Sequence, residues 1–146
     1  EVFDARVEWP IRTGRLGVVR RAPWITFVAI VLPVDLPRVA VRPRNRMVST
    51  LANPIGETVE LESTDFNRRF EVRTEDRRLA FDLLPLRNVE CILQRDETAV
   101  EFVNRRLIVW RDRLLQTSEL GPCLDHVASL VKGLPAYLWQ QQTAEV

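Results

Sequence analysis

The stretch VELESTDFNRRFEVRTEDRRLAFDLLPLR, residues 59–87, decides the fold that the sequence predicts. Its first four residues, 59–62, alternate between apolar and acidic side chains, which is typical of a short strand. Turn-forming residues follow, and a second strand begins at Phe70. Asp76 is placed to cap a helix and Pro85 to end it. The stretch therefore predicts a strand, a tight turn, a second strand and a short helix.

Two phenylalanines flank the predicted turn. We expect Phe66 and Phe70 to be buried, and we expect Asn67 to turn the backbone between them, since asparagine tolerates the left-handed conformation. The density of Asp, Asn and Arg in this stretch also suggests a functional site. The spacing explains instead how a strand turns and leads into a helix. We therefore interpret Phe66, Asn67, Phe70 and Asp76 as a structural motif.

Strands are also predicted before this stretch. Residues 2–12 alternate between apolar and polar side chains, as in a half-buried strand, and residues 16–21 are typical of a returning strand. Residues 24–32 are mostly β-branched and aromatic, which predicts a central strand buried on both faces. A buried helix is the alternative. It is disfavoured by poor helix propensity and by the bounding Pro23 and Pro33.

An irregular stretch, rich in proline and arginine, is predicted over residues 33–58, with one short strand at 39–42. Four arginines are spread through it: Arg38, Arg42, Arg44 and Arg46. They predict a basic loop face. As a nucleic-acid signal this face is weak, because no aromatic residue lies between the arginines.

A second short helix is predicted over residues 86–94. Four of its side chains are expected to point inward: Leu86, Val89, Ile92 and Leu93. Residues 99–103 and 106–110 predict a hairpin that turns at Asn104 and Arg105.

The last predicted helix begins near Pro122, with Gly121 as its cap, and ends at Gly133. Its apolar stripe consists of Leu124, Val127, Val131 and Leu134. We expect the polar tail over 140–146 to be frayed.

Length and composition predict one α+β domain over residues 1–146. The apolar share of 46% and the charged share of 28% are values of a globular protein. The expected architecture is a curved antiparallel sheet of about six or seven strands, packed against two or three helices. Cys91 and Cys123 lie among apolar neighbours, which favours free thiols in a reducing compartment, with a disulfide as the alternative.

No constellation of catalytic residues is evident in the sequence. His126 is the only histidine and no cysteine stands at ligand spacing from it, so we predict no metal site and no cofactor. Among the tryptophans, Trp9 and Trp24 are predicted to be core residues. Trp139 is expected either to pack back on the sheet or to contact a partner.

One block of the chain resembles a known family. Residues 62–72, ESTDFNRRFEV, followed by Asp76 and by Leu83-Leu84-Pro85, resemble a bacterial family of domains of unknown function. The resemblance extends loosely over residues 24–139. It implies no activity. Members often carry membrane segments before the domain, and no such segment is visible here. Asp65 stands where the family more often has glutamate.

Three functional hypotheses follow from the sequence. The first is a non-catalytic interaction or scaffold module that binds a protein or peptide through a sheet edge or the arginine-rich loop. The second is a binder of anionic lipid or nucleic acid through residues 38–46, and the third is an enzyme without a recognisable motif. Homo-oligomers are compatible with exposed strand edges. We expect a cytoplasmic location, including the inner face of the membrane through a partner or a missing N-terminal segment.

Overall fold

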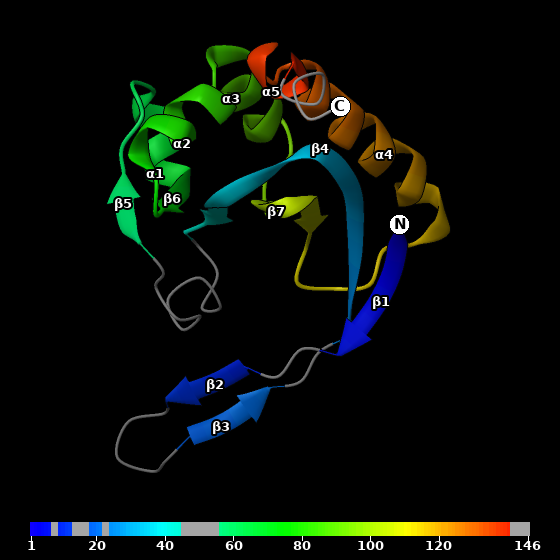
Figure 1. Cartoon of the computed structure of the whole chain (residues 1–146). Coiled ribbons are helices and arrows are strands. Elements are labelled where there is room, and N and C mark those ends of the chain that lie inside the picture. The colour runs from blue at the N-terminus through cyan, green and yellow to red at the C-terminus, as the bar shows by residue number, and fades with distance from the viewer. Residues whose placement is uncertain (7–8, 13–17, 22–23, 45–55, 141–146) are drawn as a thin grey trace.

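The computed structural model describes residues 1–6, 9–12, 18–21, 24–44 and 56–140, with backbone alone for 9–12 and 18–21. Arg46, the side chain of Trp9 and the tail over 141–146 lie outside the described residues. Figure 1 shows strands and helices in the following order: β1 Val2–Arg6, β2 Trp9–Arg12, β3 Val18–Arg21, β4 Trp24–Pro43, β5 Glu57–Val59, α1 Thr64–Arg69, β6 Phe70–Thr74, α2 Arg77–Leu83, α3 Leu86–Leu93, β7 Ala99–Trp110, α4 Thr117–Lys132 and α5 Tyr137–Gln140. The α+β class is therefore confirmed.

Five of the described strands form one antiparallel sheet around β4. Its first residues, 24–28, pair with β1, its last residues, 39–43, pair with β6, and β7 runs along its other side. The short β5 continues the sheet beyond β6. In the described part of the chain β2 and β3 form a separate two-stranded sheet. The expected six or seven strands are thus divided between two sheets, and the described helices number five rather than two or three.

The predicted strand over 2–12 consists of two pieces, β1 and β2. β1 pairs with the start of β4, where Arg6 faces Trp24. β2 pairs with β3, where Trp9 faces Arg21, so this pairing continues the register of the β1–β4 pairing. Figure 1 shows the β2–β3 pair extending away from the body of the molecule. Trp24 stands at the point of departure and is 55% exposed, so its prediction as a core residue is wrong.

β4 bends in its middle, where its pairing with β7 changes register. The register shifts between Val31 and Leu36 and again between Leu36 and Val39. β4 therefore has surplus residues at the bend, and such bulges bend a strand. On the other strand Asn104 faces Leu36 and has a positive φ of 53°. The two ends of β7 lie close together. The residues that flank them are in contact, since Arg111 Nε donates a hydrogen bond of 3.0 Å to Thr98 Oγ1.

Two predictions about this region are wrong. Residues 33–43 are not irregular but belong to β4. The strand tolerates Pro33 and Pro37, which have no backbone N–H to donate, because both lie at the bend, where the regular hydrogen bonding to β7 is interrupted by the shifts of register. The hairpin at Asn104 is also absent, because β7 continues through it from Ala99 to Trp110. Asn104 keeps its left-handed backbone within β7, opposite the bulged part of β4, and the chain does not reverse there.

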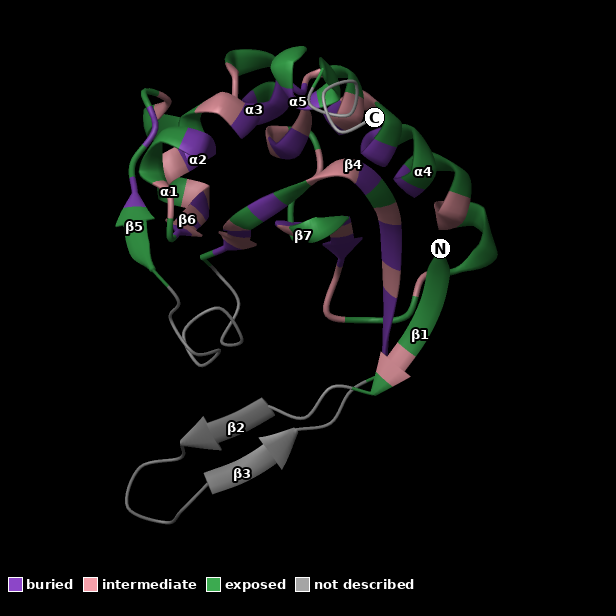
Figure 2. Ribbon diagram, in the orientation of Figure 1, coloured by how far each residue is buried: buried purple, intermediate pink, exposed green. Residues whose placement is uncertain are grey.

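Helices cover the outer side of the arch that β4 forms (Figure 1). Alternate strand residues face these helices and are buried with them, as the purple segments of Figure 2 show. The largest fully buried side chains include Phe66, Phe70, Phe102, Leu83 and Ile92. A smaller cluster belongs to the other set of strand residues and comprises Ile25, Ala99 and Trp110, with Phe27 and Ile108 packed against it. The two alternate sets of strand residues thus form two separate apolar clusters.

The stretch 59–87 contains a helix where we predicted a turn. α1 begins after Ser63, whose Oγ accepts a hydrogen bond from the Phe66 N–H at 3.2 Å. Asn67 is helical, so its predicted left-handed conformation is wrong. Its side chain instead accepts from the N–H of Leu61 at 2.9 Å and donates to the carbonyl of Leu61 at 2.6 Å. Phe66 and Phe70 are buried, as predicted, with ring centroids 5.2 Å apart.

The next two helices follow the prediction with one exception. Asp76 caps α2, since its Oδ1 accepts from the Leu79 N–H at 3.0 Å. Pro85 separates α2 from α3, and Val89 and Ile92 of α3 are buried. Leu86 is 70% exposed and not inward-facing. It is the first residue of α3, directly after Pro85.

The last long helix starts five residues earlier than predicted. A capping box of Gln116 and Glu119 starts α4 at Thr117, so Pro122 lies inside the helix. The buried stripe contains Cys123, Val127 and Leu130, while Leu124 is 45% exposed. The stripe is displaced because Cys123, a small apolar side chain, takes the inward position that we assigned to Leu124. Gly133 ends the helix, as predicted.

Candidate functional site

The predicted basic face starts on β4 and not on a loop. Arg38 Nε donates a hydrogen bond of 2.6 Å to Glu101 Oε1, and Arg42 Nη2 lies 3.7 Å from Glu101 Oε2. Glu101 is a buried residue of β7 and faces Ala40, which lies between the two arginines. Burial lowers the pKa of Arg42, while Glu101 opposes this shift. Both arginines are therefore engaged within the protein.

The other two predicted arginines do not extend this face. Arg44 Nε donates to the carbonyl oxygens of Asn67, at 2.7 Å, and Phe70, at 3.0 Å. It thereby ties the end of β4 to α1. Arg46 lies outside the described residues. The structure thus brings Arg38 and Arg42 together and places Arg44 in a different contact, and their binding role stays a prediction.

Replacing Glu101 with glutamine tests how much this ion pair stabilises the fold. The change keeps the shape and removes the charge that two partly buried guanidinium groups share. We expect the free energy of unfolding to fall by about 1.5–3 kcal/mol in a denaturant titration. Glu62→Gln, at an exposed position, is the matched control and is expected to change it by less than about 0.5 kcal/mol. Equal losses in the two variants would contradict the assigned role of Glu101.

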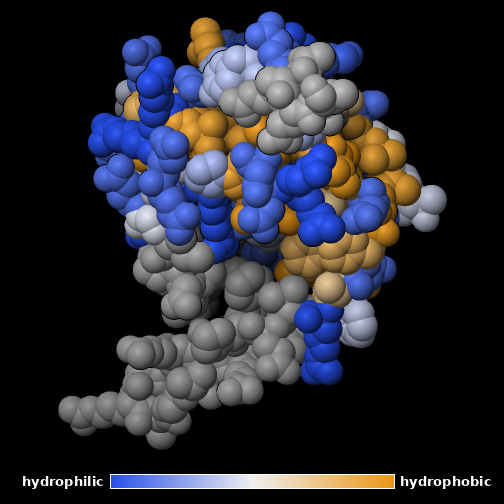
Figure 3. Space-filling view, in the orientation of Figure 1, coloured by the Kyte–Doolittle hydropathy of each residue, from blue (hydrophilic) through white to orange (hydrophobic). Residues whose placement is uncertain are grey.

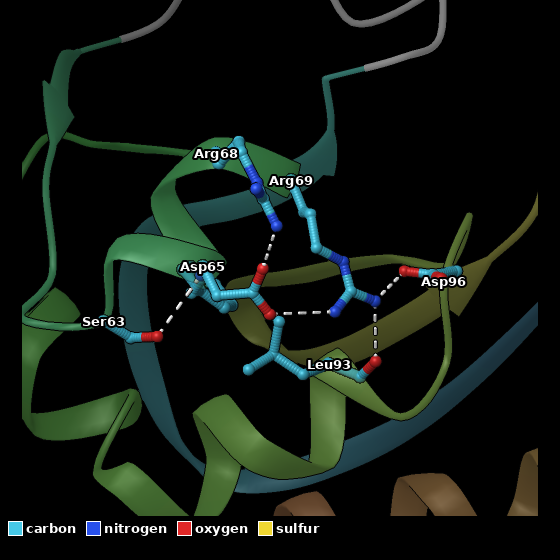
Figure 4. Close-up of polar contacts among 7 residues, drawn as sticks. Ser63, Asp65, Arg68, Arg69, Leu93 and Asp96 are labelled. Atoms are coloured by element: carbon cyan, nitrogen blue, oxygen red, sulfur yellow. Dashed lines mark hydrogen bonds and ion pairs between the residues drawn. The ribbon is translucent and has the colours of Figure 1, made fainter.

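Arg69 joins α1 to the end of α3 (Figure 4). Its Nη1 lies 3.2 Å from Asp65 Oδ2, and its Nη2 donates to the carbonyl of Leu93 at 2.8 Å and to the carboxylate of Asp96. Arg68 also contacts Asp65, at 2.6 Å. The two guanidinium groups hold the pKa of Asp65 below its usual value. These contacts explain the Asp and Arg density of the stretch 59–87 as intramolecular pairing.

A thiol and an imidazole meet between α3 and α4. Cys91 Sγ lies 3.3 Å from His126 Nδ1, and His126 is 5% exposed. Burial lowers the pKa of His126 to about 4, with further contributions from Arg95 and Arg111, and burial raises the pKa of Cys91. The pair is thus a neutral thiol and a neutral imidazole, which is not the charge state of an activated cysteine nucleophile.

Both cysteines are free in the structure, so the disulfide alternative is not adopted. Within the described residues, no three His, Cys, Asp or Glu side chains are grouped as metal ligands would be.

A groove of about 330 Å³ lies between α2 and α5. Its lining consists of Asp76, Arg78, Leu79, Asp82 and Tyr137. The Tyr137 hydroxyl donates a hydrogen bond of 2.7 Å to Asp82 Oδ2, which joins the two helices. Burial, followed by this hydrogen bond and the charge of Asp82, raises the pKa of Tyr137 to about 12. Sequence reasoning missed the groove, because the lining residues form no motif and α5 meets α2 only in the folded chain.

Large hydrophobic side chains are exposed on α5 and α2, which line the groove, and on α3, which follows α2 in the chain. Trp139 follows Tyr137 on α5 and is 40% exposed. Phe81 of α2 and Leu86 of α3 are exposed as well. Figure 3 shows hydrophobic atoms at the surface between charged side chains across the helical part of the molecule. We call Phe81, Leu86, Tyr137 and Trp139, together with the groove, the α2–α5 face.

Comparison with known protein families, curated proteins and solved structures finds no match for this chain. The resemblance of residues 62–72 to a bacterial family therefore stays a prediction. In the described part of the chain, no helix has both the length and the apolar character that a membrane crossing requires.

Proposed function

We propose that the protein is a non-catalytic interaction module that binds a protein partner through the α2–α5 face. The observation that carries this proposal is the exposure of four large apolar side chains on α2, α3 and α5, namely Phe81, Leu86, Tyr137 and Trp139, together with the groove that α2 and α5 line. Exposed apolar patches rimmed by polar groups are typical of protein interaction sites. Aromatic side chains in particular are enriched in interfaces, where they supply much of the binding energy.

The free thiols of Cys91 and Cys123 favour a reducing compartment, so we place this interaction in the cytoplasm. A second copy of the chain is one form that the partner can take. Light scattering distinguishes a self-associating chain from a monomer that binds a different protein.

The alternative, an anionic-surface binder, has less support. Arg38 and Arg42 share Glu101, and Arg44 donates to backbone carbonyls, so these three are not free to bind phosphates in the described structure. Retention on heparin or anionic vesicles tests it. An electrostatic binder is released steeply as salt rises, whereas retention that does not change with salt excludes this alternative.

Partner capture with matched surface variants tests the proposal. The tagged chain is used to isolate partners from the source cells, each candidate is identified and purified, and its dissociation constant is measured. We expect Trp139→Ser and Phe81→Ser each to weaken binding by at least about tenfold, the loss expected for an aromatic hot spot. Leu124→Ser, on exposed α4, is the control and is expected to bind as the wild type does. Equal affinities for all four proteins would overturn the proposal.

A further inference from the structure

The groove of the α2–α5 face has the chemistry of a site for a cationic side chain. We propose that it binds the guanidinium group of an arginine on the partner protein; this inference rests on the proposed function above. The groove has carboxylates from Asp76 and Asp82, the ring of Tyr137 on one side and the aliphatic Leu79 in its lining. Its volume of about 330 Å³ lies at the small end of ligand pockets, which suits one long side chain.

Both carboxylates keep unused acceptor capacity. Asp82 accepts the Tyr137 hydroxyl on Oδ2, and Asp76 accepts the Leu79 N–H on Oδ1. A carboxylate has about four acceptor positions, so each retains a second oxygen for a ligand. Neither Asp76 nor Asp82 takes part in an ion pair with any described residue. The charges that would attract a cation are therefore not neutralised by direct pairing.

Arg78 also lines the groove and reduces its negative charge. It is exposed and forms no ion pair with a described residue. The lining carries two carboxylates and one guanidinium, so its formal charge is negative at neutral pH. Burial is the largest cause of the raised pKa of Tyr137; the hydrogen bond and charge of Asp82 and the charge of Asp76 add to it, and Arg78 opposes it. The net electrostatic preference of the groove is for a cation.

A guanidinium fits this lining better than an ammonium group does. Its planar fork binds a carboxylate in two parallel hydrogen bonds, and its face stacks on an aromatic ring such as that of Tyr137. The alkyl stem of an arginine would lie against Leu79, since long cationic side chains cover apolar surface with their methylene groups.

Titration with capped amino acids tests the inference directly. N-acetyl-arginine methylamide is added to the isotope-labelled protein, and amide chemical shifts are followed by NMR. We expect saturable shifts confined to α2 and α5. N-acetyl-citrulline methylamide has nearly the same shape without the charge, and we expect it to bind at least about tenfold more weakly. Absence of saturable shifts, or equal binding of the citrulline probe, would overturn the inference.

Two variants link the shifts to the groove. Asp82→Asn is expected to weaken binding of the arginine probe by at least about tenfold, whereas Asp125→Asn, an exposed aspartate of α4, leaves it unchanged. Tyr137→Phe keeps the ring and frees both oxygens of Asp82, so it is expected to bind at least as tightly. Undiminished binding in Asp82→Asn, or lost binding in a folded Tyr137→Phe protein, contradicts the proposed site. If only the probe fails while Trp139→Ser still loses the protein partner, the interaction face stands and the arginine inference falls.

Discussion

Replacing Phe66 with alanine is expected to lower the free energy of unfolding by about 3–5 kcal/mol, the range for truncation of a buried phenylalanine. Phe66 is fully buried, and its ring stacks on that of Phe70 at a centroid distance of 5.2 Å. It is also the only buried residue of α1. Truncation therefore opens a cavity and releases α1 from the core. A denaturant titration monitored by circular dichroism measures the loss.

Arg68→Ala is the matched control two residues away on the same helix. The Arg68 side chain is 77% exposed and pairs only with the exposed Asp65 among the described residues. We expect a loss below about 0.5 kcal/mol, as for most surface ion pairs. Small and equal losses in the two variants would show that the stretch 59–87 does not anchor the core.

Lowering the pH from 6.5 to 4 is expected to remove roughly 3 kcal/mol of stability through His126 alone. Its pKa is lowered to about 4 in the folded protein from an ordinary value of 6.5. Between these values the unfolded chain binds a proton at His126 that the folded chain does not bind. The contribution of His126 to the free energy of unfolding is therefore fully present above about pH 6.5 and is lost as the pH falls toward 4. Below about pH 4 both states are protonated, and this group contributes no further loss.

The physical cause is the surroundings of His126. Burial is the largest cause of the lowered pKa, and Arg95 and Arg111 add to it because they disfavour a positive charge there. The ring Nε2 is buried without a partner among the described residues, and Nδ1 lies 3.3 Å from Cys91 Sγ. His126→Gln removes the titration, and no other histidine exists in the chain. Plots of unfolding free energy against pH should therefore be flatter for the variant between pH 6.5 and 4. Parallel plots would refute this account.

Local signals in the sequence were sufficient for many elements. Asp76 caps α2 because its side chain reaches a backbone N–H three residues away, a contact that needs no tertiary partner. Gly133 ends α4, and the β-branched and aromatic run over residues 24–32 belongs to a central strand, for similarly local reasons. The fold class followed from these periodicities, since apolar faces of period two and period 3.6 must be buried against each other.

Local signals were insufficient where two segments distant in sequence meet. Asn104 has the backbone of a turn residue, yet β7 runs through it because β4 lies alongside. Arg38 and Arg42 stand in a proline-rich stretch that looks irregular, yet Glu101 is 63 residues from Arg38 and pairs with it across the sheet. The groove likewise depends on Tyr137 reaching Asp82, 55 residues earlier in the chain.

The sequence by itself therefore determined the α+β class, the burial of Phe66 and Phe70, the cap at Asp76 and the end of α4 at Gly133. Each depends on hydrophobic periodicity or on hydrogen bonds within a few residues. Only the tertiary structure decided the bend in β4, the engagement of Arg38 and Arg42 by Glu101, and the groove of the α2–α5 face. These features depend on contacts between strands and helices far apart in the chain, and the geometry of such contacts is set by packing, which no local pattern encodes.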